Sequence, residues 1–162
     1  MEAITPNLPA PTKKNRTMWC GPYALAVCLG LSYDEAYELA LKVTRQDRIK
    51  GLANHYVEKA LRRHGIRTEF KGLRQSAGVS MQFMYGKQRG YVSLLNLRNA
   101  LDYLKPNRLY IVNVTRHYVV LDTSDMTVID NQTRGWWPVD RHRNAGKQVQ
   151  CVAEVCRVNP AA

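Results

Sequence analysis

The pattern of apolar and polar residues divides the chain into a helical first part and a second part of β-strands. Apolar residues up to His64 recur at helical spacing and predict three helices. These are residues 21–29, a helix that starts after Ser32, and residues 52–64. From Arg108 onward, short apolar runs predict strands. These are residues 109–114, 117–121, 127–130 and 149–158. Helices followed by antiparallel strands indicate an α+β domain.

Local signals mark the ends of the first two helices. Pro22 suits the first turn of a helix, where its missing N–H costs nothing, and Gly30 is a typical C-terminal stop. Ser32 and Glu35 have the spacing of a capping box, in which each side chain bonds the backbone N–H of the other. We therefore expect a buried helix directly after Cys20 and an amphipathic helix directly after Ser32.

The middle of the chain has less regular patterns. Residues 66–71 alternate apolar and polar, which predicts a strand. Residues 73–90 hold three glycines and little periodicity, which predicts a long surface loop. Ser93 precedes leucines at helical spacing, so we expect it to cap a helix that Pro106 ends. Residues 123–125 (Thr-Ser-Asp) predict a tight turn between two strands.

Three reactive side chains lie at the ends of predicted elements. Cys20 lies where the first helix begins, and there the helix dipole and unpaired backbone N–H groups favour the thiolate. His117 opens a predicted strand, and Asp130 and Asn131 end the next one. A thiol nucleophile needs a base, an orienting partner for that base, and donors for the developing oxyanion. We expect Cys20 to be the nucleophile, His117 the base, and either Asp130 or Asn131 the orienting residue.

The oxyanion donors expected are the backbone N–H of Cys20 and the side chain of Asn15. Each residue also has an ordinary interpretation, because cysteines are usually small buried hydrophobes and aspartates often make turns. The combination of Cys20, His117 and Asp130, in this order and on these elements, favours a thiol enzyme. The other three histidines lack a comparable setting and are not expected in the site; they are His55, His64 and His142.

The remaining cysteines do not suggest a metal or a disulfide framework. Cys28 belongs to the predicted buried helix and is expected to pack as a small hydrophobe. Cys151 and Cys156 have an odd offset, so a regular strand would point them to opposite faces. The chain has no C-x-x-C motif or nearby histidine pair, and we expect neither a metal nor an organic cofactor.

Length and composition are those of one globular domain. The 162 residues contain no apolar run near the ~20 residues that span a bilayer. Residues 1–15 contain three prolines and no hydrophobic signal region, so we expect an extended arm before a single domain over residues 16–162. We expect the protein to be cytoplasmic, or packaged and delivered without a signal peptide.

The net charge of +11 changes the expected partners. A field of this sign attracts polyanions such as nucleic acid, anionic wall polymer or acidic proteins. The same charge is also compatible with an ordinary solvated surface, because no block of consecutive basic residues marks a binding tail. For an enzyme, it favours a protein or peptide substrate of acidic character.

The motifs around the three candidate residues resemble a known superfamily. The segment from Cys20 to Leu25 resembles the nucleophile motif of papain-like cysteine peptidases, especially C39-type (bacteriocin-processing-like) small bacterial or phage peptidases. The segment from His117 to Leu121 resembles their histidine strand, and Asp130 matches the third triad member. The resemblance implies a papain-like fold, with the nucleophile at a helix N-terminus packed on a C-terminal antiparallel sheet. It also implies a peptidase that works through a thioester intermediate.

The chain departs from the family pattern in two places. The family usually has a glutamine a few residues before the cysteine, where this chain has Lys14 and Asn15. An Asp-Pro or Asn-Pro pair often follows the histidine strand, whereas here Asp130 precedes Asn131. Two alternatives therefore remain open. One is an inactive papain-like scaffold that binds nucleic acid or an acidic protein, and the other is a peptidoglycan amidase or acyltransferase with the same triad.

Overall fold

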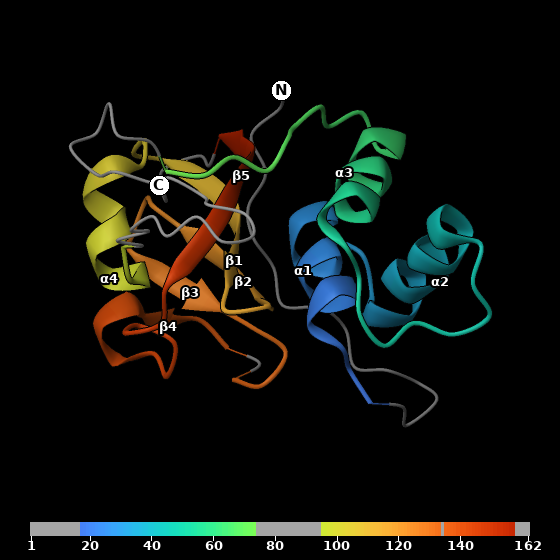
Figure 1. Cartoon of the computed structure of the whole chain (residues 1–162), viewed down its shortest axis with the longest axis horizontal. Coiled ribbons are helices and arrows are strands. Elements are labelled where there is room, and N and C mark those ends of the chain that lie inside the picture. The colour runs from blue at the N-terminus through green and yellow to red at the C-terminus, as the bar shows by residue number, and fades with distance from the viewer. Residues whose placement is uncertain (1–16, 74–94, 134, 158–162) are drawn as a thin grey trace, which may run out of the picture.

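Three N-terminal helices pack against a C-terminal antiparallel sheet, as the sequence predicts (Figure 1). The computed structural model describes residues 17–73, 95–133 and 135–157. The predicted N-terminal arm and nearly all of the predicted loop over residues 73–90 lie outside these ranges. The three helices are α1 (Cys20–Leu29), α2 (Tyr33–Thr44) and α3 (Asn54–Arg63).

The sheet has five strands in the order β4-β3-β2-β1-β5, and all neighbouring strands are antiparallel. The strands are β1 (Arg108–Val114), β2 (His117–Asp122), β3 (Thr127–Ile129), β4 (Trp137–Pro138) and β5 (Val149–Arg157). Four of them agree with the predicted strands to within one residue at each end. The short β4 strand was not predicted, because two residues give no recognisable alternation.

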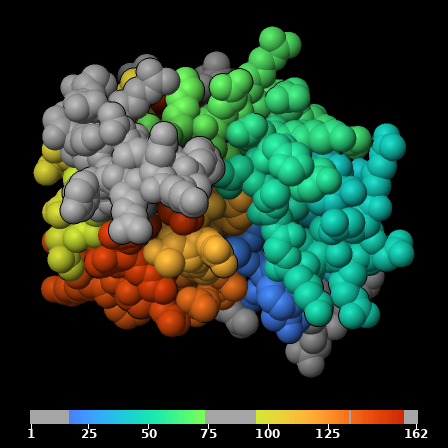
Figure 2. All heavy atoms as spheres, in the orientation of Figure 1, coloured from blue at the N-terminus to red at the C-terminus, as the bar shows by residue number. Residues whose placement is uncertain are grey.

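Alternating side chains of the sheet belong to two apolar clusters on its two faces. Leu109 and Ile111 of β1 pack with the residues of α1, α2 and α3. Tyr110 and Val112 pack on the other face, beneath the one-turn helix α4 (Leu97–Ala100). In the space-filling view, α1 (blue) shows only as a narrow band between the strands (orange) and the outer helices (teal to green) (Figure 2). The helix that starts at Cys20 is therefore the central element of the helical layer.

Close packing and hydrogen bonds fix the start of α1. A Cβ atom on Gly21 would lie 2.7 Å from Cβ of Leu52, so only glycine fits there without a shift. The backbone N–H of Trp19 donates to the hydroxyl of Tyr33 on α2 (2.8 Å). Gly30 ends the helix with a φ of 66°, the left-handed conformation that glycine adopts readily. Ser32 caps α2 as predicted, and its hydroxyl accepts from the N–H of Glu35 (3.1 Å).

Two predictions for the middle of the chain are wrong. The segment predicted as a strand over residues 66–71 forms only an isolated bridge, between Lys71 and Val152. The N–H of Phe70 donates to the Glu58 side chain of α3 (3.0 Å) rather than to a strand. Ser93, the expected helix cap, lies outside the described residues. Residues 95 and 96 are not helical, so the helix starts later than expected: α4 begins at Leu97, and Asn96 caps it. The backbone N–H of Leu97 donates to the carbonyl of Lys147, and this bond ties the start of α4 to the loop before β5.

A bulge in β5 places two cysteines on the same side of the sheet. The pairing with β1 skips one residue between the partners of Tyr110 and Leu109. Cys156 therefore packs in the cluster beneath the helices, and Cys151 accepts a hydrogen bond from Asn54 of α3 (3.3 Å). The prediction of opposite faces holds only for a regular strand and is wrong here. The four cysteines form no disulfide, and Cys28 is fully buried as predicted.

Candidate active site

The thiol of Cys20 lies at the first residue of α1 and is half-buried. Burial alone would raise its pKa. Hydrogen bonds from the His117 side chain and from the backbone N–H groups of Tyr118 and Gly21 outweigh the burial, so the pKa of the Cys20 thiol is lower than usual. The sulfur therefore has the donors that a thiolate needs, from both the helix and the strand beside it.

A two-residue hairpin turn places His117 at the start of β2. Val114 of β1 pairs with His117, and the turn residues Thr115 and Arg116 have φ values of 49° and 65°. Positive φ at both positions is the conformation of a type I′ turn, whose twist matches that of antiparallel strands. The turn makes His117 the first residue of its strand, next to the start of α1.

Asp130, rather than Asn131, contacts the imidazole of His117. The ring atom Nε2 of His117 lies 2.8 Å from Oδ2 of Asp130, and therefore the hydrogen bond between His117 and Cys20 is assigned to Nδ1. The pairing of β2 with β3, continued by one residue, puts Asp130 beside Val119. Since Val119 and His117 are two residues apart on one strand face, the carboxylate and the imidazole are diagonal neighbours.

The charges of His117 and Asp130 stabilise each other. Burial of the imidazole lowers the pKa of His117, but the hydrogen bonds and charges of Asp130 and Cys20 outweigh burial and raise it to about 9. Burial raises the pKa of Asp130, but the hydrogen bonds from His117 and Thr133 hold it well below its usual value. At neutral pH the site therefore contains an imidazolium between a carboxylate and a thiol that is prone to ionise.

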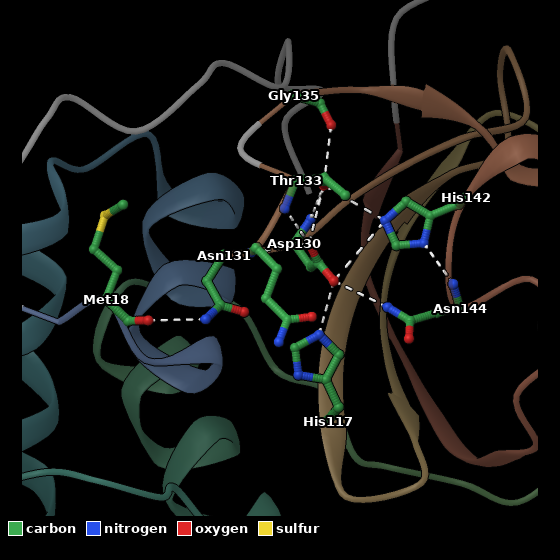
Figure 3. Close-up of polar contacts among 9 residues, drawn as sticks. Met18, His117, Asp130, Asn131, Thr133, Gly135, His142 and Asn144 are labelled. Carbon is green, nitrogen blue, oxygen red and sulfur yellow. Dashed lines mark hydrogen bonds and ion pairs between the residues drawn. The ribbon is translucent and has the colours of Figure 1, made fainter.

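Asn131 has a different contact, although the sequence leaves it as an alternative to Asp130. Its side-chain amide donates to the backbone carbonyl of Met18 (2.8 Å), just before α1 (Figure 3). This bond ties the end of β3 to the start of α1. Asn131 thus connects the helix side of the site to the sheet side, and Asp130 contacts the imidazole.

The sequence predicts two oxyanion donors, the backbone N–H of Cys20 and the side chain of Asn15. The backbone N–H of Cys20 belongs to the first turn of α1, where N–H groups have no partner within the helix. Asn15, the side-chain donor expected from the sequence, lies outside the described residues. In the described part of the site, the backbone N–H of Cys20 is therefore the candidate oxyanion donor.

Sequence reasoning missed three residues that surround Asp130 (Figure 3). Thr133 donates its backbone N–H and its hydroxyl to Oδ1 of Asp130 (2.8 and 2.9 Å). Asn144 donates its side-chain amide to Oδ2 (2.9 Å), and His142 places Nε2 3.9 Å from the same oxygen. The expectation that His142 lies apart from the site is therefore wrong. Thr133 was recognisable as a turn residue, but the loop with His142 and Asn144 has no periodic pattern.

Other kinds of site are not found in the described ranges. Residues 17–73, 95–133 and 135–157 contain no group of three or more histidine, cysteine, aspartate or glutamate side chains that could hold a metal ion. No helix in these ranges has the length and apolarity needed to cross a membrane. No protein-family model, curated protein or solved structure matches this chain.

Proposed function

We propose that this protein is a papain-like cysteine hydrolase, a peptidase that cleaves an amide or isopeptide bond. The observation that carries the proposal is a continuous chain of hydrogen bonds from the Cys20 thiol through His117 to Oδ2 of Asp130. A chain of nucleophile, base and orienting carboxylate is the arrangement by which thiol hydrolases activate sulfur. The resemblance of the motifs at Cys20 and His117 to those of C39-type peptidases supports the same proposal.

The geometry suggests the order of proton and bond changes. The Cys20 thiolate attacks the substrate carbonyl carbon, and the backbone N–H of Cys20 faces the developing oxyanion. The C–N bond breaks as His117 gives its proton to the leaving amine, and this leaves a thioester on Cys20. Water then attacks the thioester while His117 takes one of its protons. The carboxylic acid product leaves, and the Cys20 thiolate and the His117 imidazolium are restored.

Asp130 contributes by holding the imidazole and its charge. Its carboxylate is buried, with 1% of the residue exposed, so solvent screens its contact with His117 only weakly. A fixed negative charge beside Nε2 favours the imidazolium that forms with the thiolate. The same contact aims Nδ1 at the sulfur, which is the direction that both proton transfers require.

The pH dependence of thiol alkylation tests the activation of Cys20. We expect iodoacetamide to modify Cys20 rapidly well below the free-thiol pKa of about 8.5, and the His117→Ala variant to lose this rapid phase. Peptide mass mapping of the modified cysteines gives an internal control, because burial raises the pKa of the Cys151 thiol. Identical pH profiles of alkylation at Cys20 and Cys151 in the unsubstituted protein would contradict the assignment of Cys20, His117 and Asp130 as a catalytic triad.

Hydrolysis itself is tested on a set of fluorogenic peptides that includes acidic sequences. We expect Cys20→Ala and His117→Ala each to abolish cleavage while the circular dichroism spectrum stays that of the unsubstituted protein. Activity retained by either variant would contradict the assignment. Amine acceptors and peptidoglycan fragments belong in the same screen, because an acyltransferase or an amidase would use the same three residues.

One observation favours a second candidate function, the binding of a polyanion. A cavity of about 860 Å³ lies apart from the triad, and its lining includes Arg62, Arg67 and Lys71. Glu69 and Glu154 also line it, and Glu154 pairs with the lining residue Lys105 (3.4 Å), so the basic groups outnumber the acidic ones. Salt-dependent retention on nucleic acid that Cys20→Ala does not change would support this candidate. If the protein is not retained on nucleic acid even at low salt, polyanion binding is excluded.

A further inference from the structure

Both carboxylate oxygens of Asp130 accept hydrogen bonds, and the donors to the two oxygens come from different parts of the chain. Oδ1 accepts from the backbone N–H groups of Gln132 (3.0 Å) and Thr133 (2.8 Å), both within its own turn. Oδ2 accepts from His117 (2.8 Å) and from Asn144 (2.9 Å), which comes from the loop before β5. The turn fixes Oδ1. Besides His117, Oδ2 has Asn144 as a hydrogen-bond donor, and Nε2 of His142 lies 3.9 Å from it.

We propose that Asn144 is a positioning residue that fixes the direction in which Asp130 meets His117. This inference rests on the proposed hydrolase function. Rotation about the Cβ–Cγ bond moves both oxygens together, so a donor on Oδ2 adds to the restraint that the turn places on Oδ1. The amide of Asn144 bonds Oδ2 from a different direction than His117 does (Figure 3). Two donors on Oδ2 and the turn on Oδ1 leave the carboxylate one orientation.

Asn144 is itself held rigidly enough for this role. It is 1% exposed, so water cannot replace its bond to Asp130. Its backbone N–H donates to Nδ1 of His142 (3.1 Å), and therefore Nδ1 carries no proton and the ring is neutral. The same bond fixes the loop before Asn144, and the carbonyl of Asn144 accepts from the N–H of Lys147 (3.0 Å). Backbone and side chain of Asn144 thus connect His142 to Asp130.

The second ring nitrogen of His142, Nε2, contacts Thr133, the residue that bonds the other oxygen of Asp130. Nε2 lies 3.5 Å from the hydroxyl oxygen of Thr133, and that hydroxyl gives its own hydrogen to Oδ1 of Asp130 (2.9 Å). Nε2 must therefore donate, which agrees with a proton on Nε2 alone. Burial and the positive charges of His117 and Arg143 lower the pKa of His142, against the opposite effect of Asp130, so a neutral ring is favoured. His142 holds the loop in place as a neutral ring.

The test compares Cys20 alkylation in the Asn144→Leu variant and in a matched control. Leucine keeps the approximate volume of asparagine and removes the donor. We expect the alkylation rate of Cys20 at pH 6 to fall about tenfold, the scale of one hydrogen bond to a charged group. The control is Thr123→Val, which likewise removes a buried polar group (residue 3% exposed), here a hydroxyl whose bonds go to Lys105 and Arg108. We expect its alkylation profile to match that of the unsubstituted protein.

The outcomes separate this inference from the proposed function. Rapid alkylation at pH 6 in both the unsubstituted protein and Asn144→Leu would overturn the role of Asn144 and leave the hydrolase proposal standing. Slow alkylation in the unsubstituted protein would overturn both. Equal losses in Asn144→Leu and Thr123→Val would show a general structural effect and overturn the positioning role. A loss in Asn144→Leu alone would support it.

A measurement on the unsubstituted protein covers the case in which Asn144→Leu does not fold. After Cys20 is alkylated, the NMR resonance of the Asn144 side-chain amide is followed while His117 titrates. We expect it to shift with the imidazole, because both groups bond the same oxygen. The side-chain amide of Asn131 is the control, since Asn131 directly follows Asp130 but its amide donates to the carbonyl of Met18. An Asn144 resonance that moves no more than that of Asn131 would overturn the inference.

Discussion

Different interactions fix the helix side and the sheet side of the candidate site. On the helix side, Cys20 begins α1, whose next eight residues, Gly21–Cys28, are all buried. On the sheet side, Asp130 follows β3 and accepts hydrogen bonds from its own turn, from His117 and from Asn144. Apolar packing therefore sets the position of the sulfur, and hydrogen bonds set the position of the carboxylate.

This contrast indicates which changes each side tolerates. Packing depends on volume, so the helix side should accept a change at the half-buried thiol itself but resist added volume behind it. Hydrogen-bonded groups depend on their partners, so the sheet side should resist the loss of a single polar group. The hydrogen bond from Asn131 to the carbonyl of Met18 joins the two sides. Packing on the helix side and hydrogen bonding on the sheet side therefore both contribute to the geometry of one site.

The largest effect on stability should come from removing the carboxylate. Asp130→Ala leaves the buried donors of Thr133 and Asn144 without their acceptor, and we expect it to lower the free energy of unfolding by about 3–5 kcal/mol. Cys20→Ala, on the other side of the same site, should cost less than about 1 kcal/mol. Urea unfolding of the two variants measures the difference. Similar losses in both would contradict the contrast between the two sides.

The three central residues could be predicted from the sequence because each one ends or begins a regular element. Cys20 opens a helix, His117 opens a strand and Asp130 follows one, so hydrophobic periodicity was enough to place them. The choice between Asp130 and Asn131 depends on which side chain turns toward the imidazole. That direction comes from the register of β2 and β3, which the sequence does not specify without the turn geometry.

The residues around Asp130 could not be predicted for a related reason. His142 and Asn144 belong to a loop whose path is set by tertiary hydrogen bonds rather than by periodicity, such as that from Arg98 to the carbonyl of Ala145. The strand predicted over residues 66–71 is wrong because alternation shows an extended, half-buried segment but not whether it has a partner. The bulge that turns Cys156 toward the helices likewise leaves no mark in the sequence pattern.

An intermediate effect is expected from adding volume behind the thiol. Gly21→Ala puts a methyl group 2.7 Å from Cβ of Leu52, so α1 or the chain at Leu52 must shift. We expect a loss of about 1–3 kcal/mol in urea unfolding, together with slower alkylation of Cys20. Gly51→Ala is the control, because a Cβ at Gly51 meets no atom within 4 Å. Equal stability of the two variants would show that packing does not fix the start of α1.

The smallest effect should separate the two histidines that approach Asp130. The pKa of His117 is raised to about 9, whereas burial of the ring lowers that of His142. A histidine whose pKa is lower in the folded state binds fewer protons folded than unfolded. Its contribution to stability is therefore present above the ordinary value of about 6.5 and is lost as the pH falls below that value. His117 has the opposite sign: its contribution is full below about 6.5 and is lost as the pH rises through 9.

The His142→Asn variant isolates this contribution, because asparagine offers an acceptor in place of Nδ1 and does not titrate. We expect the unsubstituted protein to lose stability between pH 7 and pH 5 more steeply than His142→Asn in urea unfolding. His117 and the carboxylates contribute to both proteins, so the difference between the two slopes belongs to His142. Asp130 loses its own contribution only as the pH falls below the ordinary carboxyl value of about 3.9, outside this range. Equal slopes would mean that His142 does not stay neutral beside Asp130, and the sheet side of the site would then depend on charge as well as on hydrogen bonds.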